Sequence, residues 1–359
     1  MGVINLTPDS FSDGGELNSS KKVLDQVNHF LSNGVDVIDL GAQSTRPGAE
    51  EVGSSTEIKR LIPYLKLIKS ELPDVLISID TYNEGVHFLN FNNPNLVIKK
   101  VLRASISDLI CKGINPKYYF ISFSGNNNHL SKKNICKICL ALKQEQKKYN
   151  IILSGGDTTR SNKLSITISS IGYSKRHPVL RSGAKNNDDI YITNNIGDAF
   201  MGLNVLKKKI KLSKKSTDYF IKQFYLPNIP IKFSKKIHLF ANSAIDISDG
   251  FFQDLQHILS TSNLSSKLFK NKIPISSYLN SYLIRTKKNK LNFISNGDDY
   301  QILFTASKKQ RNLIKKISKN TSTKVSKVGI VKNKSISKTI KSINGEINFP
   351  KKLGYIHNF

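Results

Sequence analysis

The chain has 359 residues, of which 38% are hydrophobic, and a formal net charge of +29. This length allows two domains with separate cores, and the sequence has no apolar run near the roughly 18 residues that a membrane span needs. With three cysteines and no basic and apolar leader after Met1, it predicts a cytoplasmic protein with no membrane association. The lysines are spread along the chain without interleaved aromatic residues, so specific nucleic-acid binding is not expected.

The N-terminal part of the chain, up to residue 83, alternates short apolar runs with segments whose apolar side chains recur at helical spacing. Strands that alternate with helices indicate parallel βαβ units. The predicted strands are 2–6, 36–40 and 75–79, and the predicted helices are 20–33 and 55–72.

A second pattern begins at residue 84, and a further domain is predicted to start near Val179, after the loop YSKRHP. The predicted strand 151–153 should end in a turn at Gly155-Gly156. Cys136 and Cys139 form a C-x-x-C that we interpret as packing on a helix face, because no second pair or histidine cluster accompanies it. The other predicted strands are 118–123, 164–173, 190–193 and 302–305, and the predicted helices are 96–112, 131–148, 197–207, 215–224, 234–241 and 250–260.

Two motifs near the N-terminus follow apolar strands: GVINLTPDSFSDGG (2–15) and GAQSTRPGAEEV (41–52). They resemble the first strand–loop units of dihydropteroate synthases, which are TIM barrels with their site at the C-terminal ends of the strands. The resemblance implies that Asn5 lies near magnesium and the pterin diphosphate, that Thr45 contacts the diphosphate, and that Asp80 binds the pterin ring. Only three of the eight strands are present, so dihydropteroate synthesis by this chain is not expected.

The remaining motifs run to the end of the chain: EGVHF (84–88), ASISDLICKG (104–113), SGGDTTRS (154–161), LRSGAKNNDDIYI (180–192), AIDISDGFFQDLQHI (244–258), SNGDDYQILFT (295–305) and KLGYIHNF (352–359). Together they resemble thiamine-phosphate kinase. The resemblance implies a two-domain fold like that of aminoimidazole ribonucleotide synthetases, a homodimer, and transfer of the γ-phosphoryl group of ATP to thiamine monophosphate. We therefore expect an α/β protein with an α+β kinase part and an N-terminal partial TIM-barrel βαβαβ fragment. Its expected divisions are 1–83, 84–178 and 179–359.

Isolated aspartates in turns of small residues suit this chemistry, because magnesium prefers hard oxygen ligands and must neutralise two phosphorylated anions. Gly155-Gly156 allows backbone N–H groups to approach phosphate, and Arg181 offers a forked donor. By resemblance, the magnesium ligands are Ser78, Asp80, Asp108, Asp157, Asp246 and Asp249, the ATP contacts are Gly156, Arg181 and Ser248, and the thiamine phosphate pocket is lined by His87, Asp298 and Tyr355.

Residues 75–88, VLISIDTYNEGVHF, carry both resemblances at once. Because the kinase motif EGVHF follows immediately, we expect the strand 75–81 to pair with kinase strands and Asp80 to face Asp108 and Asp157. Residues 1–74 should then form a small βαβα unit beside that strand or pair with its free edge.

Two departures from the kinase pattern are visible in the sequence. The family's Gly-Asp-Asp-Ala-type turn, which supplies a further magnesium aspartate, is missing, and Asp298 stands where the family has glutamate. We therefore expect a weakened kinase. The alternatives are a dihydropteroate synthase that uses the N-terminal motifs, and an inactive fusion or relic.

Overall fold

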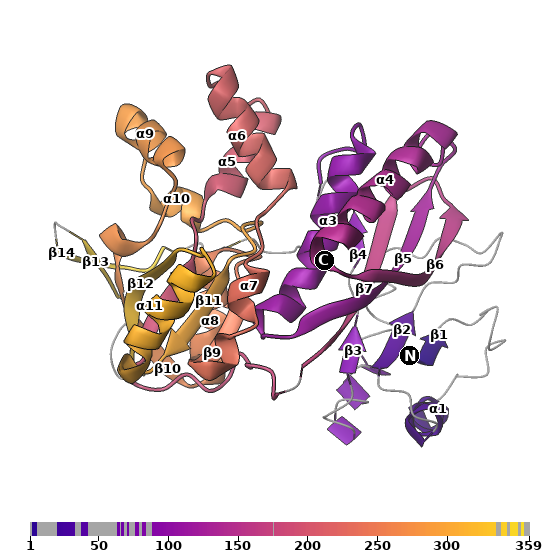
Figure 1. Cartoon of the computed structure of the whole chain (residues 1–359), viewed down its shortest axis with the longest axis horizontal. Helices are drawn as coiled ribbons and strands as arrows, with labels where there is room; N and C mark the ends of the chain where they lie inside the picture. The colour runs from indigo at the N-terminus through magenta and orange to yellow at the C-terminus, as the bar shows by residue number, and fades with distance from the viewer. Residues whose placement is uncertain are drawn as a thin grey trace.

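The computed structural model describes residues 2–5, 20–32, 37–41, 76–78, 81–83, 88–174, 176–334, 339–342, 345–350 and 353–354, together with 63–64, 66–67 and 70–71. These residues form three sheets (Figure 1). Within this part of the chain, no helix is long and apolar enough to cross a membrane.

The N-terminal sheet contains β1 (Gly2–Asn5), β2 (Val37–Gly41) and β3 (Leu76–Ser78), all parallel and in that order. The helix α1 (Ser20–Ser32) connects the first two strands and buries Val23 and Val27. The predicted parallel βαβ start is therefore confirmed. Of the predicted helix 55–72, residues 63–64, 66–67 and 70–71 are helical, and the rest lies outside the described residues.

The junction between the two resemblances falls between two short strands. β3 pairs with β2, with Ile77 opposite Ile38, whereas β4 (Thr81–Asn83) pairs antiparallel with β7 (Ser165–Tyr173). The prediction that the whole strand 75–81 joins the kinase strands is thus wrong for 76–78 and confirmed at Thr81. The backbone groups along one edge of β2 form hydrogen bonds with β3. The N-terminal sheet therefore continues as far as Ser78.

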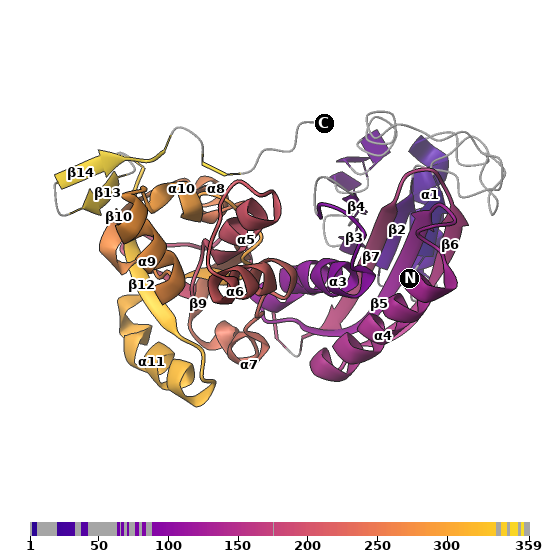
Figure 2. The same ribbon diagram turned by 90° about the horizontal axis from the view of Figure 1, so that it is seen from above.

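The middle sheet has the order β4-β7-β5-β6, with β5 (Asn115–Gly125) parallel to β6 (Ile152–Arg160). The helices α3 (Pro94–Cys111) and α4 (Lys132–Tyr149) share a hydrophobic core with β5 and β7 (Figure 2). The predicted turn at Gly155-Gly156 is wrong, because β6 continues through both glycines. Gly156 pairs with Ile121, whose carbonyl oxygen would lie 1.9 Å from a Cβ at this position.

The C-terminal sheet has the order β14-β13-β10-β12-β8-β11-β9, and β8, which lies between β12 and β11, is buried throughout. The helix predicted at 234–241 is wrong: the segment forms two short helical pieces and then enters β9, which pairs with β11. The strands are β8 (Asp189–Thr193), β9 (Ala241–Asp246), β10 (Leu264–Phe269), β11 (Ile302–Ala306), β12 (Val325–Asn333), β13 (Thr339–Ser342) and β14 (Gly345–Asn348). The helices are α5 (Asp198–Leu206), α6 (Lys214–Tyr225), α7 (Ile231–Ser234), η1 (Ile237–Leu239), α8 (Phe251–Thr261), η2 (Lys270–Lys272), α9 (Ser277–Thr286), α10 (Leu291–Ile294), η3 (Lys308–Gln310) and α11 (Arg311–Asn320).

Helix α3 lies between the middle and C-terminal sheets in both views (Figures 1 and 2). Its side chains share one core with Phe224 and Tyr225 of α6, while its last residue, Cys111, belongs to a core cluster of the C-terminal sheet. Polar side chains on this helix can therefore face residues of both parts of the kinase region. The domain divisions at 83 and 178 stay a prediction.

Asp198, at the start of α5, gives a testable pH dependence. Its carboxylate accepts hydrogen bonds from Ser276 Oγ at 2.7 Å and from the Tyr219 hydroxyl at 2.8 Å. Burial raises the pKa of Asp198 to about 6, and both hydrogen bonds oppose that rise. Because the pKa in the unfolded chain is about 3.9, the stabilisation from this group is complete below that pH and is lost as the pH rises through the folded value.

The stability of the variant Asp198→Asn relative to the unchanged chain should therefore rise by about 1.5 kcal/mol between pH 5 and pH 8. Urea denaturation at the two pH values measures this difference. Asp218→Asn, at an exposed aspartate of α6, is the control and should show no such trend. A difference for Asp198→Asn that does not change with pH would contradict the assignment.

Candidate functional site

The carboxylate of Asp246, at the end of β9, is buried against α3. Its Oδ2 accepts a hydrogen bond from Ser107 Oγ at 2.5 Å. Burial raises the pKa of Asp246, and the hydrogen bond from Ser107 and the positive charges of Arg181 and Lys112 oppose this rise. Ser107 of α3 therefore holds one predicted magnesium ligand, and the predicted ATP contact Arg181 lies within electrostatic reach of that carboxylate.

Asp108 belongs to the same neighbourhood. Burial raises the pKa of the Cys111 thiol well above its usual value, and the negative charges of Asp246 and Asp108 add to this rise, while Arg181 opposes it. These three charged side chains thus lie within electrostatic reach of one thiol. Their proximity agrees with the grouping predicted for Asp108, Asp246 and Arg181.

The loop after β9 packs backbone to backbone against the loop before β11. The Asp298 N–H donates to the Ser248 carbonyl oxygen at 2.9 Å. A Cβ at Gly297 would lie 1.5 Å from that same carbonyl oxygen, so the close approach requires glycine. Ser248, Asp249 and Asp298, predicted for ATP, magnesium and substrate respectively, therefore lie on adjacent loops.

Asp254 shapes this loop and was missed by the sequence analysis. Its Oδ2 accepts hydrogen bonds from the backbone N–H groups of Asp249 at 3.2 Å and Gly250 at 3.0 Å. Burial raises the pKa of Asp254 well above its usual value, and the charges of Asp246 and Asp249 add to the effect. Ligand atoms of Asp249, Asp254 and His257 lie within 4.8 Å of one another, and the spacing of Asp254 and His257 on one helix face was an available signal.

Asp298 has an unusual backbone and two side-chain partners. Its φ of 69° lies in the left-handed region, which is uncommon for residues other than glycine and occurs often at functional sites. The Tyr300 hydroxyl donates to Oδ1 at 3.0 Å, and Lys100 Nζ lies 2.9 Å from Oδ2. Lys100 was not among the predicted site residues.

The predicted ATP contact Gly156 and the predicted magnesium ligand Asp157 lie in the middle sheet. Both are exposed on β6, which forms the edge of the middle sheet on the side away from β9 in both views (Figures 1 and 2). The Asp157 carboxylate accepts a hydrogen bond from the Thr158 N–H at 2.7 Å. The convergence of Asp157 with Asp246 in one ion cluster stays a prediction.

Several predicted residues lie outside the described part of the chain: Thr45, Asp80, His87 and Tyr355. Asn5 and Ser78 are placed only by their backbones, in β1 and β3. The expected direction of Asp80 is therefore also untested. Gly354, immediately before Tyr355, lies beside the loop after β9, since a Cβ there would be 2.8 Å from the Asp249 carbonyl oxygen.

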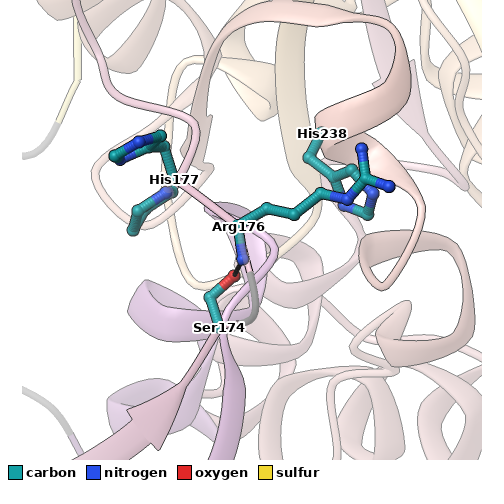
Figure 3. A pocket seen from close by; sticks show the side chains of 5 residues that line it. Ser174, Arg176, His177 and His238 are labelled. Atoms are coloured by element: carbon teal, nitrogen blue, oxygen red, sulfur yellow. Dashed lines mark hydrogen bonds between the residues drawn. The ribbon is translucent and has the colours of Figure 1, made fainter.

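A pocket of about 780 Å³ lies on the connection between β7 and β8, lined by Ser174, Arg176, His177, Pro178 and His238 (Figure 3). Burial and the charges of Arg176 and Lys236 lower the pKa of His238. None of the predicted site residues lines this pocket. It is therefore not the candidate site.

The C-x-x-C pair is also separate from the site. Cys136 and Cys139 lie on α4, and both are exposed. The interpretation of this pair as packing residues is wrong, because the buried face of α4 uses other side chains, among them Ala141 and Leu142.

Comparisons with known proteins match both families that the sequence resembles. Residues 1–87 match the family model "Pterin binding enzyme", and residues 67–174 match "AIR synthase related protein, N-terminal domain". The two matches overlap over 67–87, which includes most of the segment 75–88 that carries both resemblances. The predicted fold, like that of aminoimidazole ribonucleotide synthetases, is thereby supported for the middle sheet.

Similar proteins were found for each part. The thiamine-monophosphate kinase of Buchnera aphidicola subsp. Acyrthosiphon pisum is 38% identical over 269 residues, which cover 73% of this chain and 81% of the relative. The folate synthesis bifunctional protein of Arabidopsis thaliana is 38% identical over 148 residues, which cover 38% of this chain and 31% of the relative. A solved structure described as AaThiL complexed with AMPPCP and TMP has a TM-score of 0.69 at 25% identity, covering 82% of this chain and 96% of that one.

Proposed function

Because this chain belongs to the thiamine-monophosphate kinase family, we propose that it transfers the γ-phosphoryl group of ATP to thiamine monophosphate, in a magnesium-dependent reaction. The observation that supports this proposal most is that Asp246, Asp108 and Arg181 lie within electrostatic reach of one another's surroundings at the end of α3, while Ser248 and Asp298 lie on loops packed against each other. A carboxylate group and a guanidinium at one domain junction suit two phosphorylated anions that must be brought together.

The donor set fits magnesium. Asp246 is a buried carboxylate whose pKa is raised by desolvation, so a cation beside it would offset the cost of burying its charge. Asp108, Asp246 and Asp249 are the residues that would hold the ion, through the hard oxygen atoms that it prefers. When bound, magnesium supplies charge neutralisation for the phosphoryl group in transfer.

The chain's own side chains bind and orient the two substrates. Arg181 offers two parallel N–H donors to phosphate oxygens, and the Ser248 hydroxyl can donate to the nucleotide. The Asp298 carboxylate, held on both oxygens, accepts from an N–H donor of thiamine monophosphate. The packed loops fix the distance between Ser248 and Asp298 and so align the nucleotide with its acceptor.

The test is direct. Purified protein, ATP and magnesium should convert thiamine monophosphate to thiamine diphosphate, and calorimetry should show binding of both substrates. Protein that binds neither would be better described as an inactive fusion or relic.

The pterin-binding match favours a second candidate function at the N-terminus. Dihydropteroate synthesis uses a closed barrel, whereas the described residues of this segment form three parallel strands. We therefore propose that this segment is not a working synthase. A calorimetric titration with a pterin should be flat, and micromolar binding would reverse this assignment.

We also propose that the protein is a homodimer in the cytoplasm. Among the described residues, the edge strand β6 has a sheet neighbour on one side only, and it exposes Ile152 by 45% and Leu153 by 37%. A second copy of the chain would cover both. A reducing compartment suits the three free cysteines.

The variant Leu153→Lys should shift the protein toward the monomer, because two lysines would have to be desolvated in the interface. Light scattering at micromolar concentration measures the mass. Ile284→Lys, on the exposed side of α9, is the control and should leave the mass unchanged. Two variants of equal mass would contradict the placement of the interface on β6.

A further inference from the structure

Lys100 carries a buried charge at the junction between the two parts of the kinase region. Its side chain is 2% exposed, and Nζ lies 3.3 Å from the centre of the Phe224 ring on α6. Nζ makes no hydrogen bond of acceptable geometry among the described residues, although it lies 2.9 Å from Asp298 Oδ2. The ammonium is thus held by one carboxylate and one aromatic face.

Burying the Lys100 ammonium here would lower the stability of the fold if the side chain only filled space. Methionine or leucine would pack beside Phe224 without the loss of hydration that a buried ammonium suffers. Burial lowers the pKa of Lys100, and the charge of Asp298 opposes that change. The ion pair therefore offsets part of the free-energy cost of burying the ammonium. Such a contact is expected where the carboxylate of Asp298 itself takes part in function.

Asp298 is the more accessible partner, with 27% of its side chain exposed. Tyr300, from the same loop, binds Oδ1, while Lys100 approaches Oδ2 from α3 on the other side of the junction. With both oxygens held, the plane of the carboxylate is fixed, and the remaining lone pairs can accept from a ligand. The aspartate is one methylene shorter than the glutamate of the family pattern, so its carboxylate reaches less far. Binding of a ligand therefore depends more strongly on the orientation of this carboxylate.

We propose that Lys100 is a positioning residue for thiamine monophosphate, which it serves by fixing the Asp298 carboxylate across the domain junction. The inference rests on the proposed function. Lys100 itself does not touch the substrate; it determines where Asp298 points. If the contact only stabilised the domain interface, its loss would instead weaken the binding of ATP and of thiamine monophosphate equally.

The test uses the full chain and calorimetry with each substrate separately. Lys100→Met should weaken thiamine monophosphate binding by about ten- to a hundred-fold, the range expected for a hydrogen bond to a charged group, and change ATP binding less than about two-fold. Lys100→Arg should restore part of the affinity. Lys99→Met, the same exchange at the neighbouring, partly exposed position of α3, is the matched control and should bind both substrates normally.

A double-mutant cycle gives the decisive comparison. In an Asp298→Asn background, Lys100→Met should have almost no further effect on thiamine monophosphate binding, because the positioned carboxylate is already gone. Additive losses of affinity in the cycle, or equal losses of affinity for both substrates, would overturn the positioning role of Lys100 but leave the proposed function standing. An unchanged chain that binds no thiamine monophosphate would instead overturn the proposed function, and this assignment with it.

Discussion

Replacement of Asp246 by asparagine is expected to lower the turnover of thiamine monophosphate by at least about a hundred-fold, the scale seen when one electrostatic partner of a reacting group is removed. Asparagine keeps the shape and can still accept the hydrogen bond from Ser107 through its amide oxygen. It removes the negative charge that magnesium would need. Steady-state turnover at a series of magnesium concentrations measures the effect.

The fold of this variant should be retained or stabilised. Burial raises the pKa of Asp246, so the unchanged chain bears a cost for that charge that asparagine removes. Thermal unfolding in the absence of magnesium should therefore give an equal or higher midpoint for Asp246→Asn. Asp218→Asn is the control for the exchange itself and should leave turnover unchanged. Normal turnover by Asp246→Asn would remove this residue from the site.

The two longest helices could be predicted from the sequence, and several shorter elements could not. The observed α3 and α4 start and end within two residues of their predicted bounds. The strand β9, ANSAID, was missed because its small and polar residues have low strand propensity, and its neighbour β11 determines its conformation. Lysine-rich α11 was also missed, although Ile314 and Ile317 mark its buried face.

The junction shows how local pattern and tertiary pairing can disagree. Residues 75–81 look like one apolar strand, but the chain divides them between two sheets. Single-sequence periodicity contains no information about which edge a strand will join. The division at Ser78 and Thr81 could be found only in three dimensions.

The same limit applies to the candidate site. Asp246, Asp249 and Asp298 were found because their motifs resemble a known family, whereas Lys100 looks like one more lysine in a lysine-rich chain. Its burial depends on Phe224, more than a hundred residues away in sequence, and no local pattern indicates that contact. Asp254 was missed for a related reason. Its partners are backbone N–H groups, which no sequence pattern identifies.

A second large effect is expected on stability, at the ion pair between α3 and α4. Arg103 Nε and Nη2 donate to the two carboxylate oxygens of Glu145 at 2.7 and 2.8 Å, and Nη1 donates to the Pro227 carbonyl oxygen at 3.1 Å. Both side chains are buried. Glu145→Gln should lower the free energy of unfolding by about 3–5 kcal/mol, because it leaves the guanidinium buried without its counter-charge.

Urea denaturation gives the free energy of unfolding of the single and double variants. It separates the cost of leaving one charge without its partner from the net contribution of the ion pair to stability. Arg103→Met combined with Glu145→Met should recover most of the loss, because two apolar side chains of similar length can fill the same space without a buried charge. A double variant as unstable as Glu145→Gln would show that the pair itself stabilises the α3–α4 contact. In that case the orientation of α3, and hence the direction from which Lys100 reaches Asp298, would depend on Arg103 and Glu145.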